Sequence, residues 1–92
     1  MRLTVEFFGV PRLLSGEKKV VIAVGDDATL RDVNAELTKR FPAFLRRLIV
    51  PETYELVDSY FFYDLDARRA ARRDEKVKGG ECLLLMFVDA GG

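Results

Sequence analysis

The sequence predicts an α+β fold, in which a mixed sheet of four to five strands carries one main helix packed on one face. Residues 2–8 alternate apolar and polar side chains, as a half-buried strand does, and residues 18–24 are expected to form a second strand with Val20, Ile22 and Val24 on one face. Residues 30–41 repeat apolar side chains at helical spacing, and residues 82–88 form a short continuous apolar run. A helix that follows a hairpin has to cross the sheet, so we expect the last strand to return beside the first.

The first two strands are expected to form a hairpin with a long connection. Leu3, Val5 and Phe7 share one face of the first strand, which Gly9 and Pro11 end. The connection from there to the second strand is interpreted as a loop, because glycine, proline and serine dominate its two ends.

The main helix has a defined start and stop. Thr29 is a candidate N-cap, with Asp32 in the capping-box position three residues later. Pro42 ends the helix, because the residue before a proline avoids helical dihedral angles. Residues 43–50 are interpreted as a short second helix, and residues 52–58 as a loop without clear periodicity.

Two short features follow. Residues 60–63 are aromatic throughout and predict a short strand. Residues 67–73 contain four arginines, and the favoured interpretation is a solvated turn or edge strand. The alternative is a docking patch for an acidic partner or a phosphate-bearing ligand.

Length and charge limit the possible functions. The 92 residues are interpreted as one domain over 1–88 with a flexible tail over 89–92. Acidic and basic residues number 15 each, so no binding to nucleic acid or to a membrane surface is expected from net charge. The longest apolar run is far shorter than the ~20 residues that cross a bilayer, and no secretory signal is visible. The expected location is the cytoplasm.

Catalysis by this chain's own side chains is not expected. The chain has no histidine, which removes the commonest general base and the commonest metal ligand, so no metal site is expected. Its single cysteine, Cys82, cannot form an intramolecular disulfide and is interpreted as a small buried apolar residue.

The last strand is apolar on both faces. We expect Leu83 and Leu85 to face the core, and Leu84, Met86 and Val88 to face outward. One helix covers only one face of a sheet. The outer face is therefore covered either by the irregular segment 43–58 or by another protein.

The chain ends with Gly91 and Gly92, directly after this strand. Both glycines lack Cβ, so they can thread a narrow channel and adopt dihedral angles closed to other residues. The four residues after Val88 can reach roughly 14 Å beyond the sheet. We therefore expect the carboxylate of Gly92 to be the reactive group. The alternative is that these glycines belong to a frayed terminus without a function.

These features resemble a known family. The order of elements, the turn at residues 79–81, the apolar strand and the terminal Ala90-Gly91-Gly92 look like the ubiquitin-like sulfur carriers of β-grasp fold. These are the small subunit of molybdopterin synthase (MoaD type) and the carrier of the thiamine pathway (ThiS type). The ending from Val77 to Gly92 fits the molybdopterin type without a gap, and residues 28–33 fit the start of its helix.

The resemblance implies a carrier subunit of a sulfurtransferase with no bound cofactor. An E1-like adenylyltransferase would activate Gly92 with ATP, and a sulfur donor would convert the adenylate to a thiocarboxylate. The tail would then enter the large subunit of molybdopterin synthase or another sulfur-accepting enzyme, with Gly91 beside the reacting group. The residues that dock on these partners would be Phe8, Leu84, Met86, Phe87, Val88, Asp89 and Ala90.

Three alternatives remain open from the sequence. The chain can be a carrier for thiamine, cysteine or tRNA thiolation, or a ubiquitin-like modifier that is conjugated to lysines through Gly92. It can also be a non-covalent interaction module whose Gly-Gly ending has no chemical role.

Overall fold

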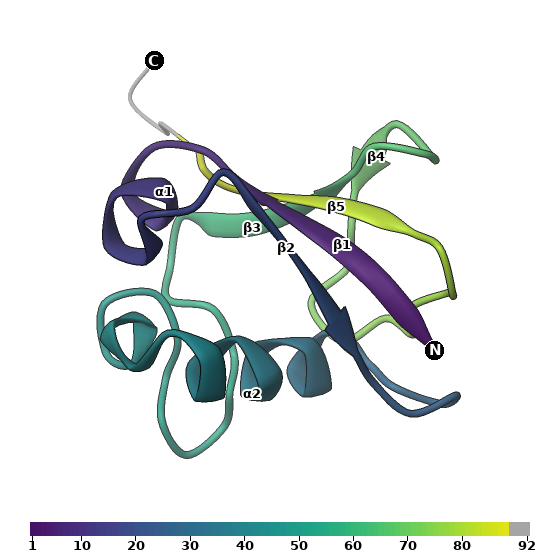
Figure 1. Ribbon diagram of the computed structural model, residues 1–92, viewed down its shortest axis with the longest axis horizontal. Helices are drawn as coiled ribbons and strands as arrows, with labels where there is room; N and C mark the ends of the chain where they lie inside the picture. The colour runs from purple at the N-terminus through teal and green to yellow at the C-terminus, as the bar shows by residue number, and fades with distance from the viewer. Residues whose placement is uncertain (89–92) are drawn as a thin grey trace.

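A five-stranded mixed sheet with the order β2-β1-β5-β3-β4 forms the upper layer of the molecule (Figure 1). In this computed structural model, residues 1–88 are described, and residues 89–92 lie outside the described part. The elements are β1 (Arg2–Phe7), α1 (Val10–Ser15), β2 (Lys19–Ala23), α2 (Leu30–Arg40), the 3-10 helix η1 (Pro42–Phe44), β3 (Tyr60–Asp64), β4 (Arg69–Ala70) and β5 (Cys82–Phe87). The predicted α+β fold with its β-grasp topology is confirmed.

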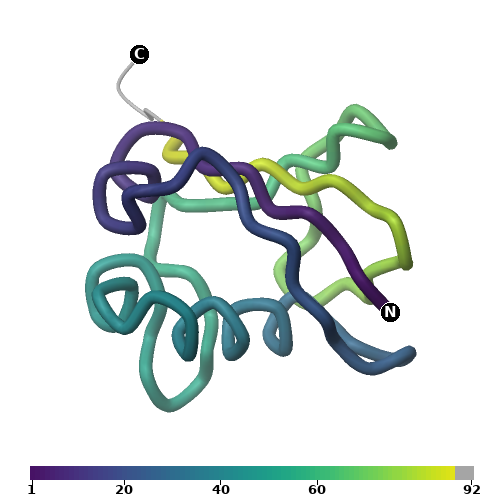
Figure 2. Tube along the Cα trace, in the orientation of Figure 1, coloured from purple at the N-terminus to yellow at the C-terminus, as the bar shows by residue number. Residues whose placement is uncertain are grey.

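The last strand lies at the centre of the sheet. β5 pairs in parallel with β1, from Thr4 opposite Cys82 to Phe7 opposite Leu85. On its other side β5 pairs antiparallel with β3, and β1 pairs antiparallel with β2. The Cα trace shows β1 and β5 running side by side in the same direction (Figure 2). The predicted return of the last strand beside the first is therefore confirmed.

The core lies between the sheet and α2. Val5, Leu83 and Leu85 project from the central strands and are buried. The predicted capping box starts α2, where the Thr29 N–H donates to Asp32 Oδ2 at 2.9 Å. The helix ends at Arg40, one residue before the predicted end.

The predicted second helix over 43–50 is wrong. Only the 3-10 turn Pro42–Phe44 forms there, and Arg46 adopts a left-handed φ of 72° that ends helical geometry. The segment instead folds back on itself, with Ile49 bridged to Leu45 and Leu56. This turn directs three fully buried side chains into the core: Phe44, Leu48 and Ile49.

The connection between β1 and β2 contains a helix, α1, where the sequence predicts a loop. α1 has Pro11 in its first turn and ends at Ser15, and the following residue, Gly16, has a left-handed φ of 73°. Proline at a helix start and glycine just past its end are the usual boundaries of a helix. At six residues, α1 is too short to show a helical apolar repeat.

The arginine-rich stretch forms the edge strand β4, as the favoured interpretation predicts. Two of its arginines are paired within the chain: Arg69 with Glu75 at 2.9 Å, and Arg73 with Glu55 at 3.2 Å. Within residues 1–88, no helix is both long and apolar enough to cross a bilayer.

Candidate functional site

The end of β5 is held in the sheet up to its last described residue. The Val88 N–H donates to the Ser59 carbonyl at 2.7 Å, and the Phe8 N–H donates to the Leu85 carbonyl at 3.3 Å. The rings of Tyr60 and Phe87 meet edge to face, with centroids 5.3 Å apart. The chain therefore leaves the sheet from a fixed point, beside α1 (Figure 1).

Exposed apolar side chains surround this exit. Of the residues predicted to dock, Phe8 is 63% exposed, Phe87 50% and Val88 47%. A shallow groove runs between them, lined by Phe8, Gly9, Val10, Tyr60 and Phe87. Exposed large apolar groups gathered at one place are typical of a protein contact surface.

Two exposed apolar residues of α1 are absent from the sequence-based set of docking residues, and one of them, Val10, lines this groove. Leu13 is 82% exposed and Val10 is 43% exposed, whereas Pro11 on the same helix is buried. The signal available in the sequence was the boundary pair Pro11 and Gly16. Once α1 is recognised as a helix, burial of Pro11 leaves Leu13 pointing away from the core.

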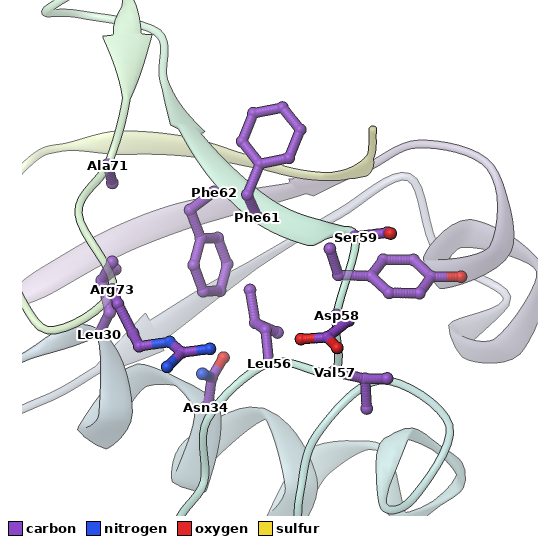
Figure 3. A pocket seen from close by; sticks show the side chains of 11 residues that line it. Leu30, Asn34, Leu56, Val57, Asp58, Ser59, Phe61, Phe62, Ala71 and Arg73 are labelled. Atoms are coloured by element: carbon purple, nitrogen blue, oxygen red, sulfur yellow. The ribbon is translucent and has the colours of Figure 1, made fainter. Parts of the chain in front are cut away.

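The outer face of the sheet carries the other predicted docking residues. Leu84 and Met86 are half-buried there, opposite Tyr63 and Phe61 of β3. Figure 3 shows Phe61 and Phe62 leaving β3 on opposite sides, with Phe62 turned toward α2. We call Phe61, Tyr63, Leu84 and Met86 the outer apolar face.

Segment 43–58 does not cover the outer apolar face. Its buried residues Phe44, Leu48 and Ile49 belong to the core on the opposite side of the sheet, so that alternative is wrong. Among the described elements, no helix or strand is layered over the face of the sheet opposite α2 (Figure 1). The four remaining predicted site residues, Asp89, Ala90, Gly91 and Gly92, lie outside the described residues.

Cys82 lies on the outer side of β5 and is held as a neutral thiol. Its Sγ donates to Glu6 Oε2 at 3.0 Å. Burial, together with the hydrogen bond to the Glu6 carboxylate and its negative charge, raises the pKa of the thiol to about 11. A thiol with such a pKa is a poor nucleophile and a poor metal ligand at neutral pH.

Three carboxyl groups meet where the β3–β4 turn approaches the start of β5. The carboxylate oxygens of Asp64, Glu75 and Glu81 lie within 4.8 Å of one another. Protein donors already bind each of them. Asp64 accepts from the Asp66 and Ala67 N–H groups, and Glu81 accepts from the Lys78 N–H. Glu75 accepts two bonds from Arg69, at 2.9 and 3.1 Å.

The two most buried of these carboxyls differ in their pKa. Hydrogen bonds from the backbone, that of Ala67 first, lower the pKa of Asp64. Burial raises the pKa of Glu81, and the hydrogen bond with Asp64 adds to the rise. The pair therefore favours a proton on Glu81 that is donated to an ionised Asp64.

Comparison with solved structures places the fold among small carrier and modifier proteins. Small archaeal modifier protein 1 from Haloferax volcanii matches over the whole of both chains, with a TM-score of 0.83 and 25% identity. A chain of the Amycolatopsis orientalis BexX/CysO complex has a TM-score of 0.72 and 26% identity. That match covers 98% of this chain and 99% of that one.

A third structure shows the same fold at lower identity. The putative molybdopterin converting factor subunit 1 from Pyrococcus furiosus has a TM-score of 0.72 and 20% identity, and the match covers 91% of this chain and 93% of that one. No protein-family model and no curated protein matches the chain.

Proposed function

We propose that this chain, which has the fold of the ubiquitin-like sulfur carriers, carries sulfur as a thiocarboxylate on Gly92. The observation that carries the proposal is the position of β5. This strand is hydrogen-bonded on both sides at the centre of the sheet, and the chain is held as far as Val88, four residues before Gly92. Such an arrangement suits a rigid body that presents a short tail ending in two glycines to an enzyme.

The chemistry requires an activating partner. An α-carboxyl group has a pKa near 3.5, so a terminal Gly92 is ionised at pH 7 and is a poor electrophile. In the proposed reaction the carboxylate attacks the α-phosphate of ATP on an E1-like adenylyltransferase, and pyrophosphate leaves. A sulfide donor then attacks the acyl carbon, and AMP leaves with the original oxygen.

This chain would supply position and recognition. Its cysteine is a neutral thiol bound to Glu6, and it has no histidine to act as a base. The exposed side chains of Phe8, Phe87 and Val88 and the outer apolar face offer apolar area to a partner on either side of the exit. We propose that the activating enzyme and the sulfur acceptor dock there in turn.

The acceptor that we propose first is the large subunit of molybdopterin synthase, which makes this chain the small subunit. The sequence from Val77 to Gly92 resembles the small subunit. The Pyrococcus furiosus structure with the same fold is described as a putative molybdopterin converting factor, subunit 1. Carriage of sulfur for thiamine, cysteine or tRNA thiolation uses the same Gly92 chemistry with another acceptor.

Conjugation to lysines through Gly92 is the second candidate. The full-length match to the Haloferax volcanii modifier protein, with a TM-score of 0.83, favours it. The same adenylate serves both functions, because a lysine amine and a sulfide donor attack the same acyl carbon.

An intact-mass measurement separates these functions. The full chain is incubated with its activating enzyme, ATP and a sulfide source, with and without the large synthase subunit and a pterin precursor. Replacement of one oxygen by sulfur on the chain supports carriage, and its reversal on adding the subunit and the pterin supports the molybdopterin assignment. Isopeptide-linked products support conjugation.

The matched control is a chain with one residue added after Gly92. We expect it to lose sulfur loading while its thermal unfolding stays unchanged. If the native chain takes up no sulfur and forms no conjugate, and deletion of Gly91-Gly92 leaves partner binding intact, the function is that of a non-covalent module.

A further inference from the structure

The strand β2 forms one edge of the sheet, and half of its backbone groups point away from the sheet. The Phe7 N–H donates to the Lys18 carbonyl at 2.8 Å, which fixes the alternation of the antiparallel ladder between β1 and β2. Every second residue along β2 therefore bonds to β1. The residues between them turn their N–H and C=O groups outward, and these are Lys19, Val21 and Ala23.

These outward groups are almost all unpaired. Among residues 1–88 their one partner is Arg40, whose Nη2 donates to the Val21 carbonyl at 3.3 Å. The edge is also regular, because β2 contains no proline and stays in register with β1 from Lys19 to Ala23. A regular edge with unpaired N–H and C=O groups is a template on which an extended segment can add as a further strand.

The surroundings of this edge are basic. A groove lies beside it, where the start of β2 and the end of α2 meet at one end of the molecule (Figure 1). It is lined by Glu17, Lys19, Val20, Val21, Arg40 and Phe41. Lys18 adjoins the groove, so three cations stand beside one carboxylate. None of these three cations is ion-paired with a carboxylate of residues 1–88. The charge of the edge therefore favours an acidic occupant.

A second copy of this chain suits the edge less well. Two β2 strands that pair antiparallel about a twofold axis would place Val21 of one copy opposite Val21 of the other. Each Arg40 guanidinium lies on its own Val21 carbonyl, so both would meet at the axis. Like charges brought together in this way oppose association.

We propose that the β2 edge binds an extended acidic segment of another protein as a sixth strand of the sheet. The backbone of the segment pairs with the outward groups of Lys19, Val21 and Ala23. One of its carboxylates binds the guanidinium of Arg40, and another binds the ammonium of Lys19. The pairing uses backbone groups of β2 and leaves the outer apolar face open. It needs neither ATP nor sulfur, so the site is independent of the chemistry proposed for Gly92.

The test is an NMR titration of the full-length, isotope-labelled chain with a capped seven-residue peptide that alternates glutamate and valine. We expect saturable shifts with a Kd on the order of 1 mM, since the cost of association offsets most of the gain from a few backbone hydrogen bonds. Hydrogen exchange of the Lys19, Val21 and Ala23 amides should slow, because each N–H gains an acceptor. A contact made by charge alone would leave this exchange unchanged.

Two altered peptides separate charge from strand pairing. Glutamine in place of every glutamate should weaken binding about tenfold or more, because the charge-assisted bonds to Arg40 and Lys19 are lost. Proline in place of the two central residues should abolish binding, because proline has no N–H to donate to the edge.

Two variants of the chain locate the site. Arg40→Gln removes the charge and should weaken binding several-fold. Val21→Pro removes an outward N–H without breaking a bond to β1, so it should abolish binding while amide shifts in the rest of the sheet persist. Arg72→Gln is the matched control, because Arg72 is exposed and follows β4 at the opposite edge of the sheet.

Three outcomes would overturn the proposal. The first is equal binding of the acidic peptide and either altered peptide, since the contact would then not require both charge and strand pairing. The second is the absence of any response of the β2 amides up to the solubility limit of the acidic peptide. The third is a peptide-free dimer that Val21→Pro dissociates, measured by analytical ultracentrifugation, which would make a second copy the occupant of the edge.

Discussion

Asp64 and Glu81 are buried carboxyl groups whose pKa values move in opposite directions. Asp64 is stabilised as an anion by the N–H groups of Ala67 and Asp66. The folded state holds the proton of Glu81 more tightly than the unfolded state does, mainly because of burial. For Glu81 the stability of the fold therefore decreases as pH rises above the ordinary pKa of 4.5. For Asp64 it decreases as pH falls below 3.8.

We predict that Glu81→Gln is more stable than the native chain at pH 7, and that this difference is smaller at pH 4. Glutamine keeps an oxygen for the Lys78 N–H and permanently supplies the donor that protonated Glu81 offers to Asp64. The gain should be about 1 kcal/mol, the usual net value of one buried hydrogen bond. Urea unfolding of the variant and the native chain at both pH values measures it. A difference that stays constant from pH 4 to pH 7 would show that Glu81 does not hold the proton as described.

The Cys82 thiol gives a second prediction at this scale. Because burial and the Glu6 carboxylate raise its pKa to about 11, its thiolate fraction at pH 8 is roughly a hundredfold below that of an ordinary cysteine. We expect iodoacetamide to alkylate the folded chain at least that much more slowly than the chain in 6 M urea. Glu6→Gln should speed the reaction in the folded state. Equal rates in both states would contradict a buried, hydrogen-bonded thiol.

At the scale of elements, secondary structure was predicted correctly where the sequence is strongly periodic, and incorrectly in short or irregular segments. The alternation in β1, the capping box of α2 and the inward parity of Leu83 and Leu85 could all be read from the chain, because each follows from a local repeat or bond. The path of segment 43–58 could not. It depends on two non-glycine residues with positive φ, Arg46 and Tyr54, a conformation that tertiary contacts impose and that no local sequence pattern indicates.

The same limit applied to the sites. The exposed character of Phe8 and Val88 follows from their position at strand ends, whereas the exposure of Leu13 depends on how α1 rests on the sheet. The burial of Asn34 could not be predicted for a similar reason. Asn34 lies in an amphipathic helix, and only the folded loop brings the Tyr54 carbonyl to its Nδ2.

Segment 43–58 acts as part of the core, and this predicts a large effect at Phe44. Its ring meets Phe7 edge to face at 5.5 Å and lies 5.2 Å from Phe41, and its side chain is fully buried. Phe44→Ala should lower the free energy of unfolding by about 3–5 kcal/mol, the usual cost of such a truncation. Leu13→Ala is the control, because Leu13 is 82% exposed and its loss should cost less than about 0.5 kcal/mol. Chemical denaturation of both variants measures the contrast. Similar costs would mean that Phe44 is not part of the core.

At the scale of the whole molecule, the sheet separates a covered side from an open one. α2, η1 and segment 43–58 cover one face and enclose the core. The other face carries Leu84 and Met86 on the central strand, in line with the exit at Val88. A partner that receives the tail can therefore bind the outer face without disturbing the core.

This arrangement predicts that Met86→Arg impairs partner binding and leaves the fold intact. Met86 lies opposite Phe61, on the strand that leads to the exit. A charge placed at the centre of an apolar interface is desolvated without a partner and typically costs 2–5 kcal/mol, so binding should weaken by about thirtyfold or more. Because Met86 is only half-buried in the free chain, the free energy of unfolding should change by less than about 1 kcal/mol.

Val21→Arg is the matched control for this variant. Val21 is 50% exposed and pairs with Thr4, which pairs with Cys82 at the far end of β5 from the exit. Titration calorimetry with the activating enzyme and with the sulfur acceptor measures both variants. Loss of binding confined to Met86→Arg would locate docking at the exit end of the outer apolar face. Equal loss for Val21→Arg would extend the interface across the whole sheet, and unchanged binding of Met86→Arg to both partners would remove the outer apolar face from the proposed mechanism.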